Sequence, residues 1–255
     1  QGGVLQMSVM SAGLMASLAP DFALLDLPFL FENPKEADAV MDGEVGKIFA
    51  QQLDAKNLVV LSYWELGFRQ LTNSRRAVET VDDIAGLKIR VVQSPIYLDM
   101  FNALGANAVP MPFPEVYTAL ETGTVDGQEN PAPSILTAKL NEVQKYMTLT
   151  RHPYNPMVLR YSKPLWNKLD PEEQKLLSEA ALEAAQFQRQ LSRDSDAKAI
   201  EEIAAAGTTV TMLAPEEVAR FREKTKGVAD AYAAKADPAV VKLLNETIAK
   251  AREAK

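Results

Sequence analysis

The sequence contains no cysteine and only one histidine, His152. Without cysteine the chain forms no disulfide, thiol nucleophile, iron-sulfur cluster or Cys-ligated zinc site. A single histidine also excludes metal sites that need two His ligands from one chain. The sequence therefore predicts neither a metal site nor a bound cofactor.

The motifs of common enzyme classes are missing as well. We find no Gly-x-Ser-x-Gly elbow, Walker A loop, Gly-x-Gly-x-x-Gly turn or His-Glu-x-x-His helix. His152 with Tyr154 or Glu129 keeps a hydrolase or lyase open as an alternative, but a lone His beside Pro153 is more often a hydrogen-bonded structural residue. We therefore expect a protein that is not an enzyme.

Charge and hydropathy argue against two further classes. The chain carries 34 acidic and 27 basic side chains, a formal net charge of -7, and shows no basic stripe with interleaved aromatics, so we expect no nucleic-acid partner. The longest apolar stretch, residues 22–31, is interrupted by Asp26 and Pro28 and is far too short to span a bilayer. With 255 residues, the chain is long enough for one large or two ordinary domains.

Strand-like and helix-like segments alternate through most of the chain, which indicates an α/β fold. Strand patterns cover residues 4–9, 58–61, 87–92, 108–113, 124–129, 143–150, 157–162 and 208–213, and helical patterns cover residues 34–56, 95–105, 114–120, 171–207, 215–234 and a last segment capped by Asp237. The helix that follows Asp170 would have roughly 35 residues and a length of about 50 Å. One compact lobe seldom needs such a length, so we expect this helix to span two lobes.

Arg90 is the side chain most suggestive of a binding site. Alternation along residues 86–92 places Leu87, Ile89 and Val91 on one strand face and Arg90 on the other. An arginine in the middle of a strand needs a partner, and its guanidinium matches a carboxylate with two parallel hydrogen bonds. Arg90 therefore either closes an internal ion pair, which is the commoner case, or receives an acidic ligand.

Six phrases together resemble one family, the solute-binding proteins of tripartite ATP-independent periplasmic (TRAP) transporters. They occur in that family's order and run through most of the chain. The phrases are residues 26–31 (DLPFLF), 67–73 (GFRQLTN), 83–90 (DIAGLKIR), 103–107 (ALGAN), 112–120 (PFPEVYTAL) and 122–131 (TGTVDGQENP).

The resemblance implies a two-lobed periplasmic-binding-protein fold with a long connecting helix and a ligand cleft between the lobes. Residues 1–67 with about 156–195 would form lobe I, and residues 68–155 with about 196–255 would form lobe II. The family also has a segment ahead of the place where this sequence starts, preceded by a signal peptide in the precursor. We therefore expect lobe I to lack its N-terminal part.

The resemblance also implies the binding residues. Arg90 matches the family's carboxylate-binding arginine, Asn130 the asparagine that addresses the same carboxylate, Arg69 a second cleft arginine, and Phe113 an apolar wall. Four further residues lie at positions that often line the pocket: Trp64, Glu65, His152 and Tyr154. Trp64 is as readily a core residue.

The function implied is capture of an organic acid in the periplasm and its delivery to the membrane permease subunits of a TRAP transporter, by a monomer. A sugar acid such as a hexuronate is favoured, and a four-carbon dicarboxylate or keto acid is the alternative within the family. A signalling receptor domain with the same pocket is a third hypothesis for the function.

Overall fold

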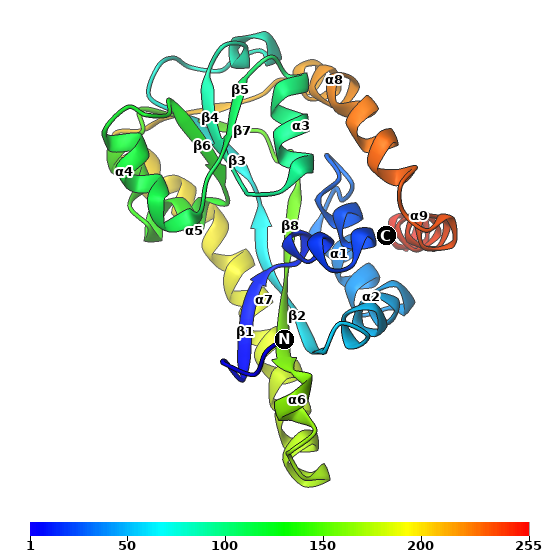
Figure 1. Cartoon of the computed structure of the whole chain (residues 1–255). Coiled ribbons are helices and arrows are strands. Elements are labelled where there is room, and N and C mark those ends of the chain that lie inside the picture. Colours follow the sequence, from blue (N-terminus) through cyan, green and yellow to red (C-terminus); the bar gives the residue numbers. More distant parts are fainter. Residues whose placement is uncertain (255) are drawn as a thin grey trace.

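Two β-sheets form the framework of the protein (Figure 1). The computed structural model describes residues 1–254. The first sheet has three antiparallel strands in the order β1-β8-β2, and the second has six strands in the order β5-β4-β6-β3-β7-β9. The strands are β1 (Met7–Ser11), β2 (Leu58–Phe68), β3 (Gln70–Asn73), β4 (Lys88–Val91), β5 (Asn107–Pro110), β6 (Gly127–Asn130), β7 (Tyr146–Leu149), β8 (Tyr154–Ser162) and β9 (Thr209–Met212).

Helices cover both sheets, as the alternating sequence pattern predicts, and the α/β fold class is confirmed. The α-helices are α1 (Pro34–Met41), α2 (Glu44–Asp54), α3 (Pro95–Ala103), α4 (Val116–Glu121), α5 (Ala132–Thr137), α6 (Lys163–Trp166), α7 (Pro171–Ala205), α8 (Pro215–Ala233) and α9 (Pro238–Glu253). Short 3-10 helices are η1 (Ala12–Ser17), η2 (Pro20–Asp26), η3 (Val81–Ile84), η4 (Phe113–Glu115) and η5 (Leu140–Val143). No helix within residues 1–254 is both long and apolar enough to cross a membrane.

The long helix α7 runs from the first sheet, on one half of the molecule, to the second sheet, on the other half. It begins at Asp170, whose side chain accepts hydrogen bonds from the backbone N–H groups of Glu172 and Glu173 in a capping box, and it continues for 35 residues. One part of α7 packs on β2 of the first sheet, and another part packs on α5 and β9 beside the second sheet (Figure 1). The predicted helix length and its span across both halves are confirmed.

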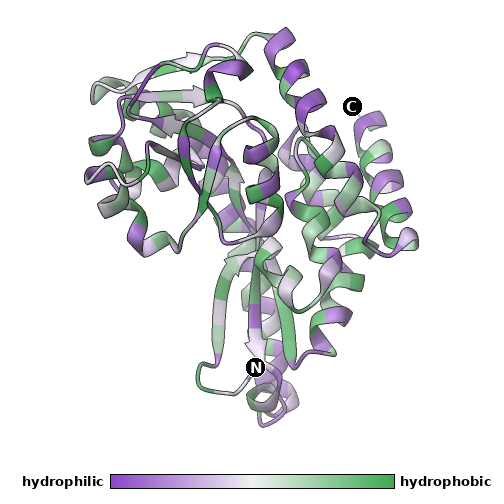
Figure 2. Cartoon of the chain, turned by 45° about the horizontal axis from the view of Figure 1, so that its top comes forward, coloured by the Kyte–Doolittle hydropathy of each residue, from purple (hydrophilic) through white to green (hydrophobic). Residues whose placement is uncertain are grey.

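The C-terminal helices return to the first half of the chain. Helix α8 packs on α3, η2 and η3, whereas α9 packs on α1 and α2. Helix α9 buries Val240, Leu244 and Ile248, one residue per turn, and accordingly alternates between hydrophobic and hydrophilic residues in Figure 2. The expected division put residues 196–255 in lobe II, but these contacts place α9 against elements of lobe I. The division into lobes stays a prediction.

Among the predicted elements, one is divided in the structure and another is much longer than predicted. The single helix expected over residues 34–56 is divided into α1 and α2 at Gly43, which takes the extended N-cap position of α2. The strand expected over residues 58–61 continues to Phe68 as β2, which crosses from one half to the other beside β8 (Figure 1). Strand β3 follows almost directly, although its polar sequence carries no strand pattern.

Candidate functional site

Arg90 and Asn130 come together at one edge of the second sheet. Arg90 lies near the carboxyl end of β4 and Asn130 at the carboxyl end of β6, and these neighbouring strands are parallel, with Arg90 opposite Gln128. Asn130 lies two residues beyond Gln128, on the same face, and its amide donates a hydrogen bond to the Gln128 Oε1 atom at 2.6 Å. In α/β sheets, ligands bind outside the carboxyl ends of parallel strands, so this edge is the place where a ligand site is expected.

The Arg90 guanidinium is buried and only partly bonded. Its side chain donates two hydrogen bonds to the Met111 carbonyl, at 3.0 Å from Nε and 2.7 Å from Nη2. Within residues 1–254 the buried Nη1 atom has no hydrogen-bond partner and no carboxylate pairs with Arg90. Burial lowers the pKa of Arg90 to about 10, so the group keeps its charge at neutral pH. The sequence left open whether Arg90 closes an internal ion pair or receives an acidic ligand. Among the described residues, Arg90 forms no internal ion pair.

A cavity of about 170 Å³ adjoins Arg90. It brings together four residues that the sequence resemblance named: Arg90, Asn130, Arg69 and Phe113. The remaining lining residues come from β1, η1, β2, β8 and the segments after β4 and β5: Ser11, Leu14, Leu66, Val92, Gln93, Met111, Pro112 and Asn155. Both sheets therefore contribute to the walls.

Arg69 is neutralised inside the protein, unlike Arg90. Its Nε atom forms an ion pair with Glu129, and its Nη2 atom lies 2.9 Å from Glu129 Oε1. Burial disfavours both charges, but their mutual attraction keeps the pKa of Arg69 above its usual value and the pKa of Glu129 below it. Arg69 also donates to the side-chain oxygens of Asn130, at 3.1 Å, and Asn155, at 3.2 Å. It therefore fixes two amides at the cavity wall and leaves Arg90 as the cation without a counter-charge.

His152 lies in the core, and the cavity at Arg90 is not lined by it. The ring is fully buried between Phe101 and Phe221, and its Nδ1 atom is 2.7 Å from the Thr150 hydroxyl. Its Nε2 atom lies 3.4 Å from Glu129 Oε2. Burial lowers the pKa of His152, so the ring is neutral at pH 7. In this position His152 lies beside the Arg69–Glu129 pair, and its Nε2 atom has no hydrogen-bond partner among the described residues.

Tyr154 is also a core residue, since it lies edge-on to the rings of Phe31 and Phe68 and is 3% exposed. Like His152, it is absent from the lining of the Arg90 cavity. The structure thus places both residues away from the position that the resemblance implied for them. His152 precedes β8 and Tyr154 is its first residue, and both side chains pack against aromatic rings of the core.

Trp64 and Glu65 belong to the central part of β2. Trp64 is half-buried, packs against a small cluster that includes Leu61, and donates to the Ser62 hydroxyl at 3.0 Å. Glu65 forms an ion pair with Arg193 of α7 at 2.7 Å and borders a second, larger groove beside the Arg90 cavity. Trp64 therefore packs at the margin of a hydrophobic cluster and does not line the Arg90 cavity, whereas Glu65 lies at the margin of the site.

Ser11 and Asn155 are among the cavity residues that the sequence reasoning missed. The Asn155 amide donates to the Ser11 hydroxyl at 2.9 Å and to Asp26 Oδ1 at 3.1 Å, while its oxygen accepts from Arg69. Asn155 thereby connects strands of the first sheet with Arg69 of the second half. The amide is fully buried and so needs these partners, but no local pattern singled it out, because β8 also carries the polar residues Arg160 and Ser162.

Asp26, the last residue of η2, also belongs to the hydrogen-bond network of Asn155. Its Oδ1 atom accepts hydrogen bonds from Asn155 and from the Tyr97 hydroxyl at 3.3 Å, and its Oδ2 atom approaches Gly13. A Cβ atom on residue 13 would lie 1.6 Å from Oδ2, so only glycine permits this approach. Burial raises the pKa of Asp26 from 3.8 to about 7, and the nearby charge of Arg69 offsets only part of that rise.

Asp26 makes stability depend on pH. The folded protein holds the Asp26 proton more tightly than the unfolded chain does, so the free energy of unfolding falls as the pH rises from about 4 to about 7. At about 1.4 kcal/mol per pKa unit, this contribution is at most about 4 kcal/mol. We expect Asp26→Asn to remove it, so that the stability of the variant relative to wild type is greater at pH 8 than at pH 4 in urea titrations.

The comparison with wild type isolates Asp26, because Arg69, Glu129 and Tyr97, the other charged or titratable groups facing it, titrate in both proteins. The matched control is Asp194→Asn, an exposed carboxylate on α7. Parallel pH profiles for Asp26→Asn and wild type would contradict the prediction.

The site suits a small anion and not a metal ion. Among residues 1–254, no three His, Asp or Glu side chains gather closely enough to hold a metal. A single uncompensated guanidinium, the Asn130 amide and apolar walls are the kinds of group that bind a carboxylate and the carbon skeleton attached to it.

Comparison with known families agrees with this chemistry. The model of the bacterial extracellular solute-binding proteins, family 7 (DctP), matches residues 1–236. The chain belongs to this family. The resemblance to TRAP solute-binding proteins drawn from the sequence motifs is confirmed, and proteins of this family serve in transport and are not enzymes.

The relatives of this family 7 protein include binding proteins for sugar acids. The 2,3-diketo-L-gulonate-binding periplasmic protein YiaO of Escherichia coli is 43% identical over 210 residues, which cover 82% of this chain and 64% of YiaO. The chain spans slightly less than two thirds of the length of the first curated relatives that it matches.

Two solved structures show the same fold. A TRAP periplasmic solute-binding protein from Ochrobactrum anthropi, with the C-terminus bound in the ligand-binding pocket, is 50% identical with a TM-score of 0.87, and the match covers 100% of this chain and 79% of the other. The sugar acid binding protein DctPAm of Advenella mimigardefordensis, in complex with galactonate, is 42% identical with a TM-score of 0.95, covering 98% and 80%.

Proposed function

We propose that this family 7 protein is the periplasmic receptor of a TRAP transporter, that it binds a sugar acid through one carboxylate, and that it delivers the acid to membrane permease subunits. The observation that carries the proposal is the buried Arg90 guanidinium. It borders the cavity, and no carboxylate among the described residues pairs with it. A buried charge without a partner is costly, so it marks a place where a ligand supplies the missing carboxylate.

The number of free cations favours one carboxylate over two. Glu129 neutralises Arg69, so Arg90 alone offers an uncompensated charge at the cavity. A four-carbon dicarboxylate would place its second charge among amides and apolar groups. Relatives named for 2,3-diketo-L-gulonate and galactonate, at 43% and 42% identity, support a sugar acid, while a succinate-bound relative at 31% identity keeps the dicarboxylate as the alternative.

The binding residues that we assign are Arg90 for the carboxylate, Asn130 as its amide partner through the N–H that does not bond to Gln128, and Phe113 as an apolar wall. Arg69 holds the two amides in place through its hydrogen bonds. Because the walls come from both halves of the molecule, ligand contacts to both would favour a closed arrangement. We further propose that the receptor works as a monomer.

A thermal-shift panel tests the proposal. We expect galactonate, galacturonate and 2,3-diketo-L-gulonate to raise the melting temperature, succinate to raise it less, and neutral galactose to leave it unchanged, since a ligand that binds only the native state stabilises it. A shift with galactose equal to that with galactonate, or a cooperative melt that no acid shifts, would overturn the proposal.

A further inference from the structure

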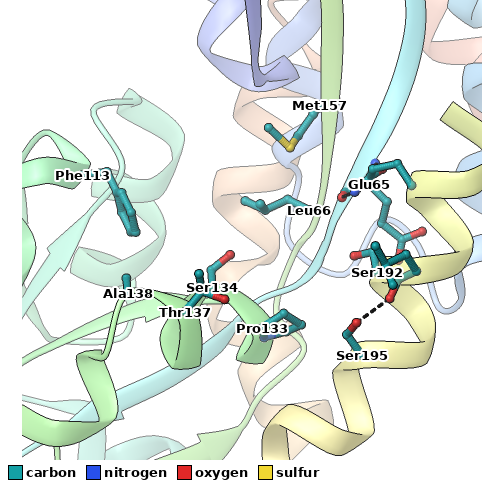
Figure 3. Close-up of a pocket in the computed structure, with 12 residues that line it drawn as sticks. Glu65, Leu66, Phe113, Pro133, Ser134, Thr137, Ala138, Met157, Ser192 and Ser195 are labelled. Carbon is teal, nitrogen blue, oxygen red and sulfur yellow. Dashed lines mark hydrogen bonds between the residues drawn. The ribbon is translucent and has the colours of Figure 1, made fainter. Parts of the chain in front are cut away.

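A second groove, larger than the Arg90 cavity, lies next to it. Its volume is about 520 Å³, and it shares Leu66 and Phe113 with the Arg90 cavity, so the two spaces adjoin at these side chains. Figure 3 shows Phe113 on one side of the groove and α7 on the other. The other lining residues come from β2, β8, α5 and α7 or follow α5 directly: Glu65, Pro133, Ser134, Thr137, Ala138, Met157, Gln188, Leu191, Ser192 and Ser195.

The two volumes suggest that one ligand occupies the Arg90 cavity and the groove at the same time. Pockets for small organic ligands usually measure about 300–1,000 Å³. The Arg90 cavity, at about 170 Å³, has room for a carboxylate and the few atoms next to it, whereas the groove alone reaches the usual range. An acid of more than a few carbons that pairs with Arg90 must therefore extend past Phe113 and Leu66 into the groove.

The groove offers hydroxyl groups and apolar faces. Phe113 and Leu191 are 45% and 54% exposed, so their surfaces are available to a carbon skeleton. In the described part of the chain, the hydroxyls of Ser134, Thr137 and Ser192 form no hydrogen bond with other protein groups. The Ser195 hydroxyl, by contrast, donates a hydrogen bond to the Leu191 carbonyl at 2.6 Å (Figure 3). Ser134 and Thr137 lie one helical turn apart on α5 and so face the groove together.

The groove carries no free charge for a second acid group. Glu65 is the one ionisable side chain in its lining, and Arg193 neutralises it. A carboxylate in the groove would lie beside Glu65 with no cation to receive it, and its desolvation would be uncompensated. A neutral chain with hydroxyl groups meets partners there without this cost.

We propose that this groove is a second subsite, which receives the neutral, hydroxylated end of an acid whose carboxylate pairs with Arg90. Ser192 of α7 and Ser134 of α5 are the specificity-determining residues of this subsite, and the preferred ligands are monocarboxylic sugar acids of about six carbons. The inference rests on the proposed function and extends it from the carboxylate to the length and polarity of the remaining chain.

Calorimetry with a series of aldonates tests the subsite. In the unaltered protein we expect galactonate, with six carbons, to bind at least about tenfold more tightly than glycerate, with three. Ser192→Leu fills the groove with a residue that favours helices and should weaken galactonate binding at least about tenfold, while glycerate affinity changes less than about twofold. Ser134→Leu, on the opposite wall, should act in the same way.

The matched control is Ser178→Leu, the same change at a half-buried serine of α7 that does not line the groove. Equal affinity of the unaltered protein for all aldonates, or equal losses for both acids in Ser192→Leu, would overturn the subsite and leave the carboxylate site standing. Binding of no acid at all would instead reject the proposed function, and with it the subsite. The comparison of acid lengths in the unaltered protein needs no variant to fold.

Discussion

Replacing Arg90 by alanine is expected to lower the affinity for galactonate by at least tenfold. Removing one partner of a buried, hydrogen-bonded charge pair costs roughly 2–5 kcal/mol, or about thirtyfold to several thousandfold in the dissociation constant. The loss should be large here because Arg90 is the uncompensated cation of the cavity, whereas Arg69 is already paired with Glu129. Isothermal titration calorimetry of wild type and Arg90→Ala measures the effect.

Lys88→Ala provides the control, because Lys88 lies two residues earlier on the same strand, has an exposed side chain and does not line the cavity. Its affinity should equal that of wild type. Arg90→Lys should recover only part of the loss, since an ammonium cannot form two parallel bonds with a carboxylate. Unchanged galactonate affinity in Arg90→Ala, with an intact cooperative melt, would show that the carboxylate binds elsewhere.

Replacing Glu129 by glutamine is expected to cost about 3–5 kcal/mol of unfolding free energy at pH 7. The variant keeps the shape of the side chain but leaves the fully buried Arg69 guanidinium without its paired carboxylate, and a buried charge stripped of its partner is strongly destabilising. Asn130 and Asn155 still accept hydrogen bonds from Arg69, but neutral amides do not replace the carboxylate. Urea unfolding followed by circular dichroism measures the loss.

The paired control is Arg69→Met combined with Glu129→Gln. Because the double variant removes both charges, it should be more stable than Glu129→Gln alone, which a purely steric role for Glu129 would not explain. Glu142→Gln breaks an exposed contact with Lys139 and should change stability by less than about 1 kcal/mol. A loss in Glu129→Gln no greater than that in Glu142→Gln would refute the prediction.

Local sequence patterns predicted the structure correctly where the residues that cause a feature lie close together in the sequence. Asp170 and Asp237 cap α7 and α9 because their side chains reach backbone N–H groups two or three residues ahead. Strand alternation correctly separated Arg90 from Ile89, since successive side chains point to opposite faces. The family motifs added the expectation that Arg90 and Asn130 meet, and the adjacent parallel strands β4 and β6 bring them to one edge.

Signals failed where a residue's neighbours come from distant parts of the chain. Strand β3 has no hydrophobic alternation, because Thr72 is buried through hydrogen bonds with Gln128 and Gln144, more than fifty residues away. The family motifs placed His152 and Tyr154 at the pocket, but aromatic contacts from separate segments enclose them in the core. No local pattern distinguishes an exposed pocket residue from a core residue on the same strand.

The sequence by itself determined the α/β class, the long helix α7, the lack of cysteine chemistry and a strand that carries one arginine on its polar face. These follow from composition and from periodicities that each segment carries alone. Only the tertiary structure decided which arginine is free. Arg69 and Arg90 are alike in sequence, yet the fold brings Glu129 to Arg69 and gives Arg90 a carbonyl oxygen and an open cavity. Charge pairing depends on distances of a few ångströms between strands far apart in the chain, and sequence spacing does not encode those distances.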